Sequence, residues 1–223
     1  MNQGDQTVKV RAVMGIPRIG WNDAWICAAE AIHQSGIPMR TFTGAFWGQN
    51  MSNALEVVCA DGVDWAITID YDTLFTKANL MRLFQILAER PDIDAIAGLQ
   101  TKRSTGLPLF SRDGETHTAI DLTQPLKVDT AHFGLTVIRL DKLRAMPMPW
   151  FWDQPSQSGS WQDEDKIDED IYFCRKWAKW GNTVYVAPDV RIGHLELMVS
   201  EFDENLQFRQ RRVTDWMETR GSN

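Results

Sequence analysis

Apolar and polar residues alternate along some stretches of this chain and recur every three to four positions along others. Strict alternation over residues 8–14 predicts a strand that ends at Gly15. Apolar residues then recur at helical spacing from a capping Asn22 to Gly36, which predicts a helix. The succession continues with predicted strands over residues 39–42, 65–69 and 94–99 and predicted helices over residues 53–60 and 80–90. This order favours an α/β fold whose mostly parallel sheet is flanked by helices on both faces.

The second half of the chain has fewer regular patterns. Residues 132–138 and 183–188 predict two further strands, and residues 171–180 predict a helix. Turn signals over residues 101–129 predict an irregular hairpin. The polar stretch 156–166 fits a mobile loop that closes over a ligand and a plain connector equally well. Apolar residues among arginines over residues 201–220 predict a C-terminal helix that packs on the domain or on a second subunit.

Length, charge and cysteine content limit the class of protein. The 223 residues contain no Pro-, Gly- or Ser-rich linker, so we expect one domain over residues 1–223. A net charge of −7 disfavours broad adhesion to nucleic acid or anionic membranes. No run approaches the roughly 20 apolar residues of a membrane span, and no basic start precedes an apolar stretch, so we expect a soluble, cytoplasmic protein. Three widely spaced cysteines fit buried thiols rather than a disulfide framework.

The strongest chemical signal follows the apolar run of residues 65–69. The chain continues there as Asp70-Tyr71-Asp72. Open α/β sheets bind ligands outside the carboxyl ends of their strands, and two carboxylates separated by one residue can share a divalent cation. A turn with two solvated acids is the alternative interpretation of the same residues.

Two later features add further acidic and metal-ligand side chains. Asp168-Glu169-Asp170 opens the predicted helix of residues 171–180, where acids also serve as ordinary partners of the helix dipole. His194 follows the predicted strand of residues 183–188, and a lone His in that position is more often structural than a ligand.

Together, the strand followed by DxD, the Glu-Asp pair at a helix start and the strand followed by His resemble the GT-A type of nucleotide-sugar glycosyltransferase. The resemblance is to inverting, family-two-like members and runs from Val8 to about Leu195. It implies a GT-A-like, Rossmann-related single domain that uses Mn²⁺ or Mg²⁺. The implied metal-binding residues are Asp70, Asp72 and His194, and the implied catalytic base is Asp170, with Glu169 as the second candidate.

Shorter motifs are similar to those of small phage and metagenomic glycosyltransferase-like proteins. These motifs are residues 14–17 (MGIP), 98–103 (GLQTKR), 148–151 (MPWF) and 169–174 (EDIYFC). Relatives usually carry an Arg before the Asn of the second helix, but here Ser52 precedes Asn53. The resemblance divides the domain into a nucleotide-binding half (7–100), an acceptor and catalytic half (101–198) and a C-terminal helix (199–223).

The resemblance also implies which residues contact the two substrates. For the donor, a UDP- or GDP-sugar, they are Pro17, Arg18, Asn53, Asp70, Tyr71, Lys102 and Arg103. For the acceptor, which is a glycan, a small molecule or a hydroxylated base of phage DNA, they are His132, Gly134, Trp150 and Trp152. Trp47 and Trp161, in predicted loops, are further candidates for acceptor contact. The C-terminal helix is a candidate site of oligomerisation.

Residues 67–74, ITIDYDTL, also resemble the nucleophile motif of haloacid-dehalogenase-like phosphatases. In that alternative Asp70 attacks phosphate, Asp72 acts as acid and base, and Mg²⁺ is bound. The motif usually ends the first strand of such a domain, whereas two predicted strands precede it here. The sequence also lacks a later strand ending in the paired acids that such a metal site needs, so we favour the transferase.

Overall fold

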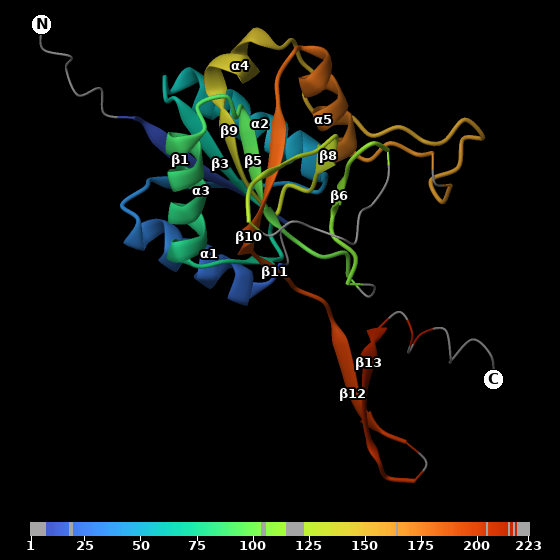
Figure 1. Ribbon diagram of the computed structural model, residues 1–223. Coiled ribbons are helices and arrows are strands. Elements are labelled where there is room, and N and C mark those ends of the chain that lie inside the picture. The colour runs from blue at the N-terminus through green and yellow to red at the C-terminus, as the bar shows by residue number, and fades with distance from the viewer. Residues whose placement is uncertain are drawn as a thin grey trace, which may run out of the picture.

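A seven-stranded sheet forms the centre of the computed structural model (Figure 1). The structure describes residues 8–17, 20–103, 106–114, 123–163, 165–203, 205–213, 215 and 217. The strand order is β2 (Met39–Thr43), β1 (Val10–Ile16), β3 (Trp65–Ile69), β9 (Leu135–Arg139), β5 (Ala95–Leu99), β10 (Val184–Arg191) and β7 (Leu126–Lys127). β9 and β7 run antiparallel to the other strands. The predicted α/β class, with a largely parallel sheet in a single domain, is confirmed.

Helices cover both faces of this sheet. α1 (Asn22–Gln34) and α3 (Lys77–Glu89) pack on one face, and α2 (Trp47–Ala60), α4 (Leu140–Ala145) and α5 (Glu169–Lys179) pack on the other. Successive side chains of a strand point to opposite faces. In β3, for example, Ala66 joins the core under α2, while Ile67 and Ile69 join the core under α1 and α3. This double burial explains why the central strands are continuous apolar runs.

The strand predicted over residues 132–138 does not extend the sheet as a further parallel strand. It forms β9, which lies between β3 and β5 and pairs antiparallel with both. A strand that is buried on both faces has the same apolar pattern in either direction. Its direction therefore depends on a pairing between residues about 70 positions apart in sequence, such as Ile69 with Leu135.

The second helix begins earlier than predicted. α2 starts at Trp47 rather than at Asn53, so the placement of Trp47 in a loop is wrong. Phe46 occupies the N-cap position, and its side chain makes no capping hydrogen bond. Gly48 and two polar residues follow Trp47, so the sequence carries neither a capping signal nor an apolar period at this helix start.

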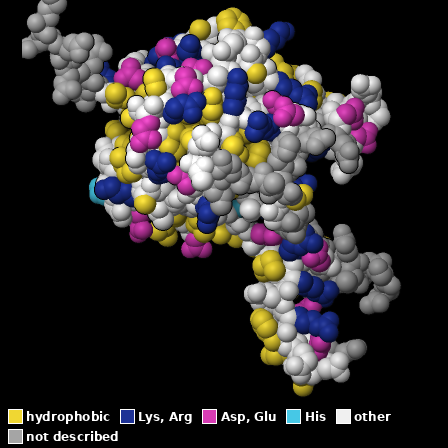
Figure 2. Space-filling view, in the orientation of Figure 1, with side chains coloured by type: hydrophobic (Ala, Val, Ile, Leu, Met, Phe, Trp, Pro, Cys, Tyr) yellow, Lys and Arg dark blue, Asp and Glu magenta, His cyan; other side chains and the backbone are white. Residues whose placement is uncertain are grey.

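The predicted C-terminal helix is also wrong over residues 199–212, whereas residues 213, 215 and 217 are helical. β12 (Met198–Phe202) and β13 (Phe208–Arg212) form an antiparallel hairpin that extends away from the sheet (Figure 1). One face of the hairpin carries the exposed apolar side chains of Met198, Phe202 and Phe208, and the other carries the ion pairs Arg209–Asp203 and Arg211–Glu201 (Figure 2). The helical period rested on apolar residues that include Phe202 at the end of β12, Leu206 in the turn and Val213 after β13. Trp216, which contributed to that period, lies outside the described residues, and oligomerisation through this segment stays a prediction.

The segment predicted as an irregular hairpin contributes to the core. β6 (Phe110–Ser111) pairs with β8 (Thr130–Ala131), while β7 joins the edge of the large sheet. Phe110 and Val128 are buried in the core under α2 and α5. Residues 104–105 and 115–122 of this segment lie outside the described part. Across the described ranges, no helix has the length and apolar character needed to cross a bilayer.

Candidate functional site

The site lies at the carboxyl ends of the parallel strands. Asp70 follows β3, and the chain then forms β4 (Thr73–Leu74), which pairs antiparallel with β11 (Gly193–His194). His194 is the register partner of Thr73, and the backbone N–H of Leu195 donates to the Asp72 carbonyl at 2.8 Å. This small sheet therefore brings His194 beside Asp72, although 122 residues separate them in sequence. The structure thus places the two residues side by side, and their joint action stays a prediction.

Asp72 is buried, and its two carboxylate oxygens differ in their partners. Oδ1 has no hydrogen-bond or ion-pair partner among the described residues. Oδ2 makes an ion pair with the Arg103 guanidinium and lies 3.4 Å from Nε2 of His194. Nδ1 of His194 lies 2.9 Å from the Thr101 carbonyl oxygen, which can only accept, so Nδ1 carries the proton and Nε2 of the neutral ring presents its lone pair. Burial lowers the pKa of His194 and favours this neutral form.

The three predicted metal ligands do not form one shell in this structure. No group of three or more His, Cys, Asp or Glu side chains within the described ranges is arranged to hold a metal ion. Asp70 is drawn to other partners: its Oδ1 accepts from the Trp47 indole N–H at 3.0 Å and from the Tyr71 backbone N–H at 2.8 Å. Burial raises the pKa of Asp70 to about 6, and these hydrogen bonds oppose the shift.

An aromatic cluster beneath the site holds Trp47 in place. Its ring meets Phe133 and Phe151 edge to face, with centroids 5.7 and 5.2 Å apart, and Phe173 stacks on both Phe151 and Trp177. Sequence reasoning missed the contact between Trp47 and Asp70, because 23 residues separate them and no local pattern links a helix start to the next strand end.

The start of α5 supplies the second group of acids. Glu169 Oε1 accepts from the Gly48 backbone N–H at 3.1 Å, in the first turn of α2, so one helix start contacts both acidic groups of the site. A Cβ atom at position 48 would lie 2.8 Å from Glu169 Oε1, so the contact requires glycine. Asp170 Oδ2 instead lies 3.6 Å from Nε2 of His132. Burial raises the pKa of both Glu169 and Asp170.

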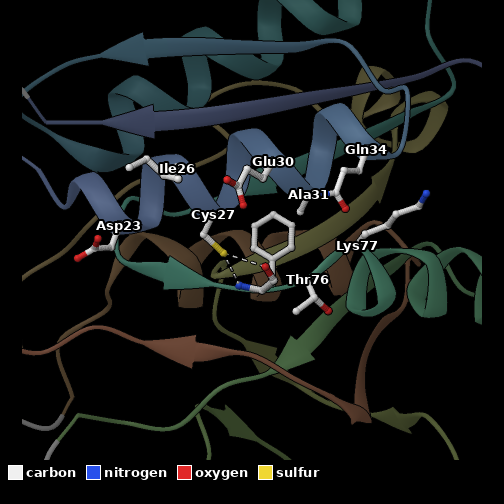
Figure 3. Close-up of a pocket in the computed structure, with 9 residues that line it drawn as sticks. Asp23, Ile26, Cys27, Glu30, Ala31, Gln34, Thr76 and Lys77 are labelled. Atoms are coloured by element: carbon white, nitrogen blue, oxygen red, sulfur yellow. Dashed lines mark hydrogen bonds between the residues drawn. The ribbon is translucent and has the colours of Figure 1, made fainter.

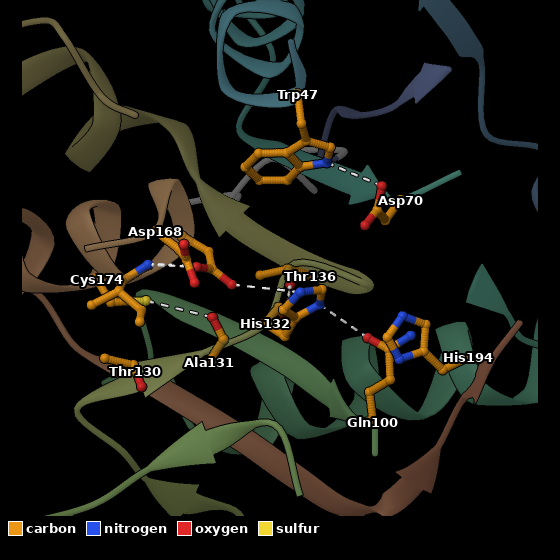
Figure 4. Close-up of polar contacts among 12 residues, drawn as sticks. Trp47, Asp70, Gln100, Thr130, Ala131, His132, Thr136, Asp168, Cys174 and His194 are labelled. Carbon is orange, nitrogen blue, oxygen red and sulfur yellow. Dashed lines mark hydrogen bonds and ion pairs between the residues drawn. The ribbon is translucent and has the colours of Figure 1, made fainter. Parts of the chain in front are cut away.

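His132 connects α5 to the strand ends. Its Nδ1 lies 3.2 Å from Oε1 of Gln100, the residue that follows β5, and its ring centroid is 5.9 Å from that of His194 (Figure 4). Burial lowers the pKa of His132, and the nearby Asp170 carboxylate partly offsets this effect. Sequence reasoning named His132 but missed Gln100, although Gln100 lies in the short motif of residues 98–103.

The predicted donor-binding residues are only partly brought together. Tyr71 and Arg103 line a hollow of about 380 Å³, together with Trp21, residues 195–197, Arg212 and Val213 from the base of the hairpin. Pro17 is half-buried after β1, and Arg18 lies outside the described residues. Lys102 is exposed, as is Asn53 on α2, whereas the neighbouring buried Asn50 donates to the Phe42 carbonyl at 2.7 Å. Asn50, and not Asn53, is therefore the α2 amide that reaches the strand ends.

The predicted acceptor residues also differ in their surroundings. Gly134 lies at the site, where its carbonyl accepts from the Asp70 backbone N–H at 3.0 Å. Trp150 is buried and its indole N–H donates to the Met146 carbonyl at 2.9 Å, so it is a core residue and the prediction of acceptor contact is wrong. Trp152 and Trp161 are exposed, and their contact with an acceptor stays a prediction.

A second hollow, of about 360 Å³, lies between α1 and the residues that precede α3 (Figure 3). Its most reactive side chain, Cys27, is engaged with the backbone: Sγ lies 2.8 Å from the Phe75 carbonyl oxygen and 3.2 Å from the Phe75 nitrogen. This thiol tethers α1 to the segment after β4 and has a structural role.

The geometry does not favour the phosphatase alternative. That alternative needs a later strand ending in paired acids near Asp70. Among the described strands, β5 leads into Gln100 and β10 leads through β11 to His194, which approaches Asp72. An amide and an imidazole therefore stand where the phosphatase site would need carboxylates.

Comparisons with known proteins identify the fold. No protein-family model and no curated protein sequence matches the chain. Among solved structures, A197 from STIV matches with a TM-score of 0.61 and 14% sequence identity, over 91% of this chain and 94% of that chain. The mannosyltransferase PcManGT from Pyrobaculum calidifontis, in complex with GDP-Man and Mn²⁺, matches with a TM-score of 0.49 and 12% identity, over 83% of this chain and 56% of that chain. At these identities, the match to A197 shows a shared fold.

Proposed function

We propose that this protein is a metal-dependent glycosyltransferase that moves a sugar from a nucleotide diphosphate sugar to an acceptor hydroxyl. The proposal rests on one observation: the structure brings two acidic side chains with different neighbouring residues to the same site. Asp72 lies buried beside His194, with Oδ1 unpartnered among the described residues and Oδ2 paired with Arg103, and Asp170 lies partly buried at a helix start beside His132. The order of motifs in the sequence, which resembles GT-A enzymes, supports the same assignment.

The residues around Asp72 fit a divalent cation. Buried acceptors without donors are costly, and among the described residues Oδ1 of Asp72 and Nε2 of His194 are of this kind, whereas Oδ2 of Asp72 pairs with Arg103. The chemistry of this donor set, carboxylate oxygen with neutral imidazole, suits Mn²⁺, and the carboxylates alone suit Mg²⁺. Asp72 and His194 would hold the ion, with Asp70 as the third ligand. A bound cation would neutralise the charge that develops on the departing diphosphate.

The chain's own side chains supply the remaining functions. Asp170, whose pKa is raised by burial, takes the proton of the attacking hydroxyl, a role that contributes about 10² to 10⁴ in rate. Glu169 is held by the Gly48 N–H and fixes the start of α5 against α2. The hollow beside Tyr71 and Arg103 is the proposed place for a UDP- or GDP-sugar, because Arg103 can pair with diphosphate oxygens.

The direct test is a panel of nucleotide sugars with Mn²⁺, in which release of nucleoside diphosphate and binding of each donor are measured. Acceptors in the panel are a glycan, small alcohols and DNA with hydroxylated bases. A phosphate monoester is included, because its cleavage is expected only of a phosphatase. We expect nucleoside diphosphate release with at least one donor. Absence of both turnover and donor binding across the panel would contradict the proposal.

The variant Asp72→Asn is expected to weaken Mn²⁺ and nucleotide diphosphate binding together. The amide removes the negative charge that attracts the cation, and the cation carries the diphosphate. Titration calorimetry with Mn²⁺, then with nucleotide in excess Mn²⁺, measures both effects. Asp61→Asn is the matched control, because Asp61 also pairs with arginines, Arg11 and Arg40, but away from the site. Unchanged nucleotide affinity in Asp72→Asn would exclude this residue as a ligand.

His194→Ala is expected to raise the Mn²⁺ concentration needed for half-maximal activity, with partial recovery at high Mn²⁺. The neutral ring supplies the ligand lone pair, and burial lowers the pKa of His194, so in the wild type acidification should loosen the ion only below about 6.5, the ordinary His value. His33→Ala, on the exposed side of α1, is the control. A metal titration that His194→Ala leaves unaltered would show that His194 is structural.

A further inference from the structure

Gln100 is a buried amide whose contacts determine its orientation. Only 3% of its surface is exposed. Nε2 lies 3.2 Å from Thr73 Oγ1 and 3.3 Å from the Gly193 carbonyl oxygen. A carbonyl only accepts, so the nitrogen of the amide must face Gly193 and the oxygen must face His132. The opposite orientation would place two acceptor oxygens against each other.

This orientation sets the tautomer of His132. Gln100 Oε1 accepts, so Nδ1 of His132, at 3.2 Å, carries the proton. In the neutral ring, Nε2 then presents its lone pair, and the nearest charged group to it is Asp170, whose Oδ2 lies at 3.6 Å. Figure 4 shows His132 between Gln100 and the start of α5.

The neighbouring glycine keeps room for this arrangement. A Cβ atom at position 134 would lie 2.4 Å from Gln100 Oε1 and 2.8 Å from its carboxamide carbon. Gly134 also accepts the Asp70 backbone N–H, so it cannot shift freely. The close approach of Gln100 to this backbone therefore requires glycine.

We propose that Gln100 and His132 are positioning residues for the base of the transfer reaction, which rests on the function proposed above. The acceptor hydroxyl loses its proton to Asp170, and its oxygen forms the new bond to the sugar. The bond from the sugar to the diphosphate breaks, and its electron pair leaves with the diphosphate. The protonated Asp170 then approaches His132 from the present 3.6 Å and donates a hydrogen bond to its Nε2, and that bond is available only in the tautomer that Gln100 imposes.

The test combines a reading of the tautomer with kinetics. In protein labelled with ¹⁵N at histidine, two-bond ¹H–¹⁵N correlations without substrate should show His132 protonated at Nδ1. Gln100→Met keeps the length of the side chain but removes the acceptor, so the Nδ1–H form should lose its dominance. Transfer should then fall about tenfold or more in kcat, while the donor KM and nucleotide Kd stay unchanged.

Two further variants separate positioning from folding. His132→Phe keeps a planar ring without the lone pair, and combining it with Gln100→Met should add no further loss, because both act through one hydrogen bond. If Gln100→Met does not fold, Gly134→Ala displaces the same amide oxygen and should show the same tautomer change. Gln85→Met is the control, because Gln85 is an exposed amide on α3 that donates to Glu89 at 2.9 Å.

A wild-type His132 protonated at Nε2 would overturn the inference, as would a Gln100→Met protein that transfers sugar at the wild-type rate. Additive losses in the double variant would also overturn it. A wild-type protein without transfer activity would overturn the proposed function and the role in proton transfer with it. Because the tautomer is measured without substrate, a failure of the proposed function can be told apart from a failure of the contact between Gln100 and His132.

Discussion

Replacing Asp170 by Asn is expected to lower sugar transfer by about 10² or more while donor binding survives. The amide cannot take the proton of the acceptor hydroxyl. It does keep an acceptor oxygen for the Ile171 backbone N–H, which Asp170 Oδ1 contacts at 2.7 Å, so the start of α5 should remain folded. If Asp170 were only a first-turn acid, the change would cost about 0.3 to 1 kcal/mol of stability and little rate.

Single-turnover transfer and nucleotide titration together distinguish these roles. Hydrolysis of the donor by water should fall less than transfer, because assistance to the leaving group does not depend on Asp170. Asp168→Asn is the control, since Asp168 is the N-cap residue of α5 but is exposed and pairs with Lys166 at 3.0 Å. Near wild-type transfer by Asp170→Asn would exclude it as the base and direct attention to Glu169 or to a retaining mechanism.

The parts of the site that follow from local pattern were predictable from sequence. Asp70 and Asp72 come after an apolar run, and a strand that ends in acids at the binding edge of an α/β sheet is recognisable without coordinates. Glu169 and Asp170 open a helix with a clear period. His194 required the resemblance as well, because nothing local shows that β11 pairs with β4.

The parts that depend on contacts between distant segments were not predictable. Gln100 is an ordinary polar residue after a strand, and its role arises only because β9 inserts between β3 and β5 and brings His132 beside it. The role of Trp47 was likewise not predictable, because it depends on the start of α2 lying against the end of β3, where its indole N–H donates to Asp70. The hairpin was missed for another reason: Phe202, Leu206 and Val213 fit a helical period, although they lie at the end of β12, in the turn and after β13.

Asp70→Asn is expected to stabilise the metal-free protein by up to about 3 kcal/mol at pH 7.5. The pKa of Asp70 is about 6 in the folded protein against an ordinary value of 3.8, because burial penalises the charged form. A difference of about 2 between these pKa values corresponds to about 3 kcal/mol. Asn is neutral and keeps the Oδ1 acceptor for both Trp47 and Tyr71, so it avoids the penalty without losing these hydrogen bonds.

The stability gain of Asp70→Asn should depend on pH, and this dependence identifies the buried charge as its cause. Between pH 3.8 and 6 the folded state binds the Asp70 proton more tightly than the unfolded state, so wild-type stability falls across this window as pH rises. The advantage of Asp70→Asn should therefore be near zero at pH 3.8 and below, grow across the window and stay constant above it. Denaturant unfolding of both proteins at a series of pH values measures it.

Asp141→Asn is the matched control, because Asp141 also accepts from the next backbone N–H, that of Lys142 at 2.9 Å, but is exposed. Mn²⁺ should stabilise the wild type, and less so the Asp70→Asn protein, since the variant lacks one proposed ligand charge. A gain that does not depend on pH would show that the buried charge is not its cause. A gain together with weakened Mn²⁺ stabilisation would show that Asp70 is kept ionisable for binding at the expense of stability, as expected of a buried acid in a functional site.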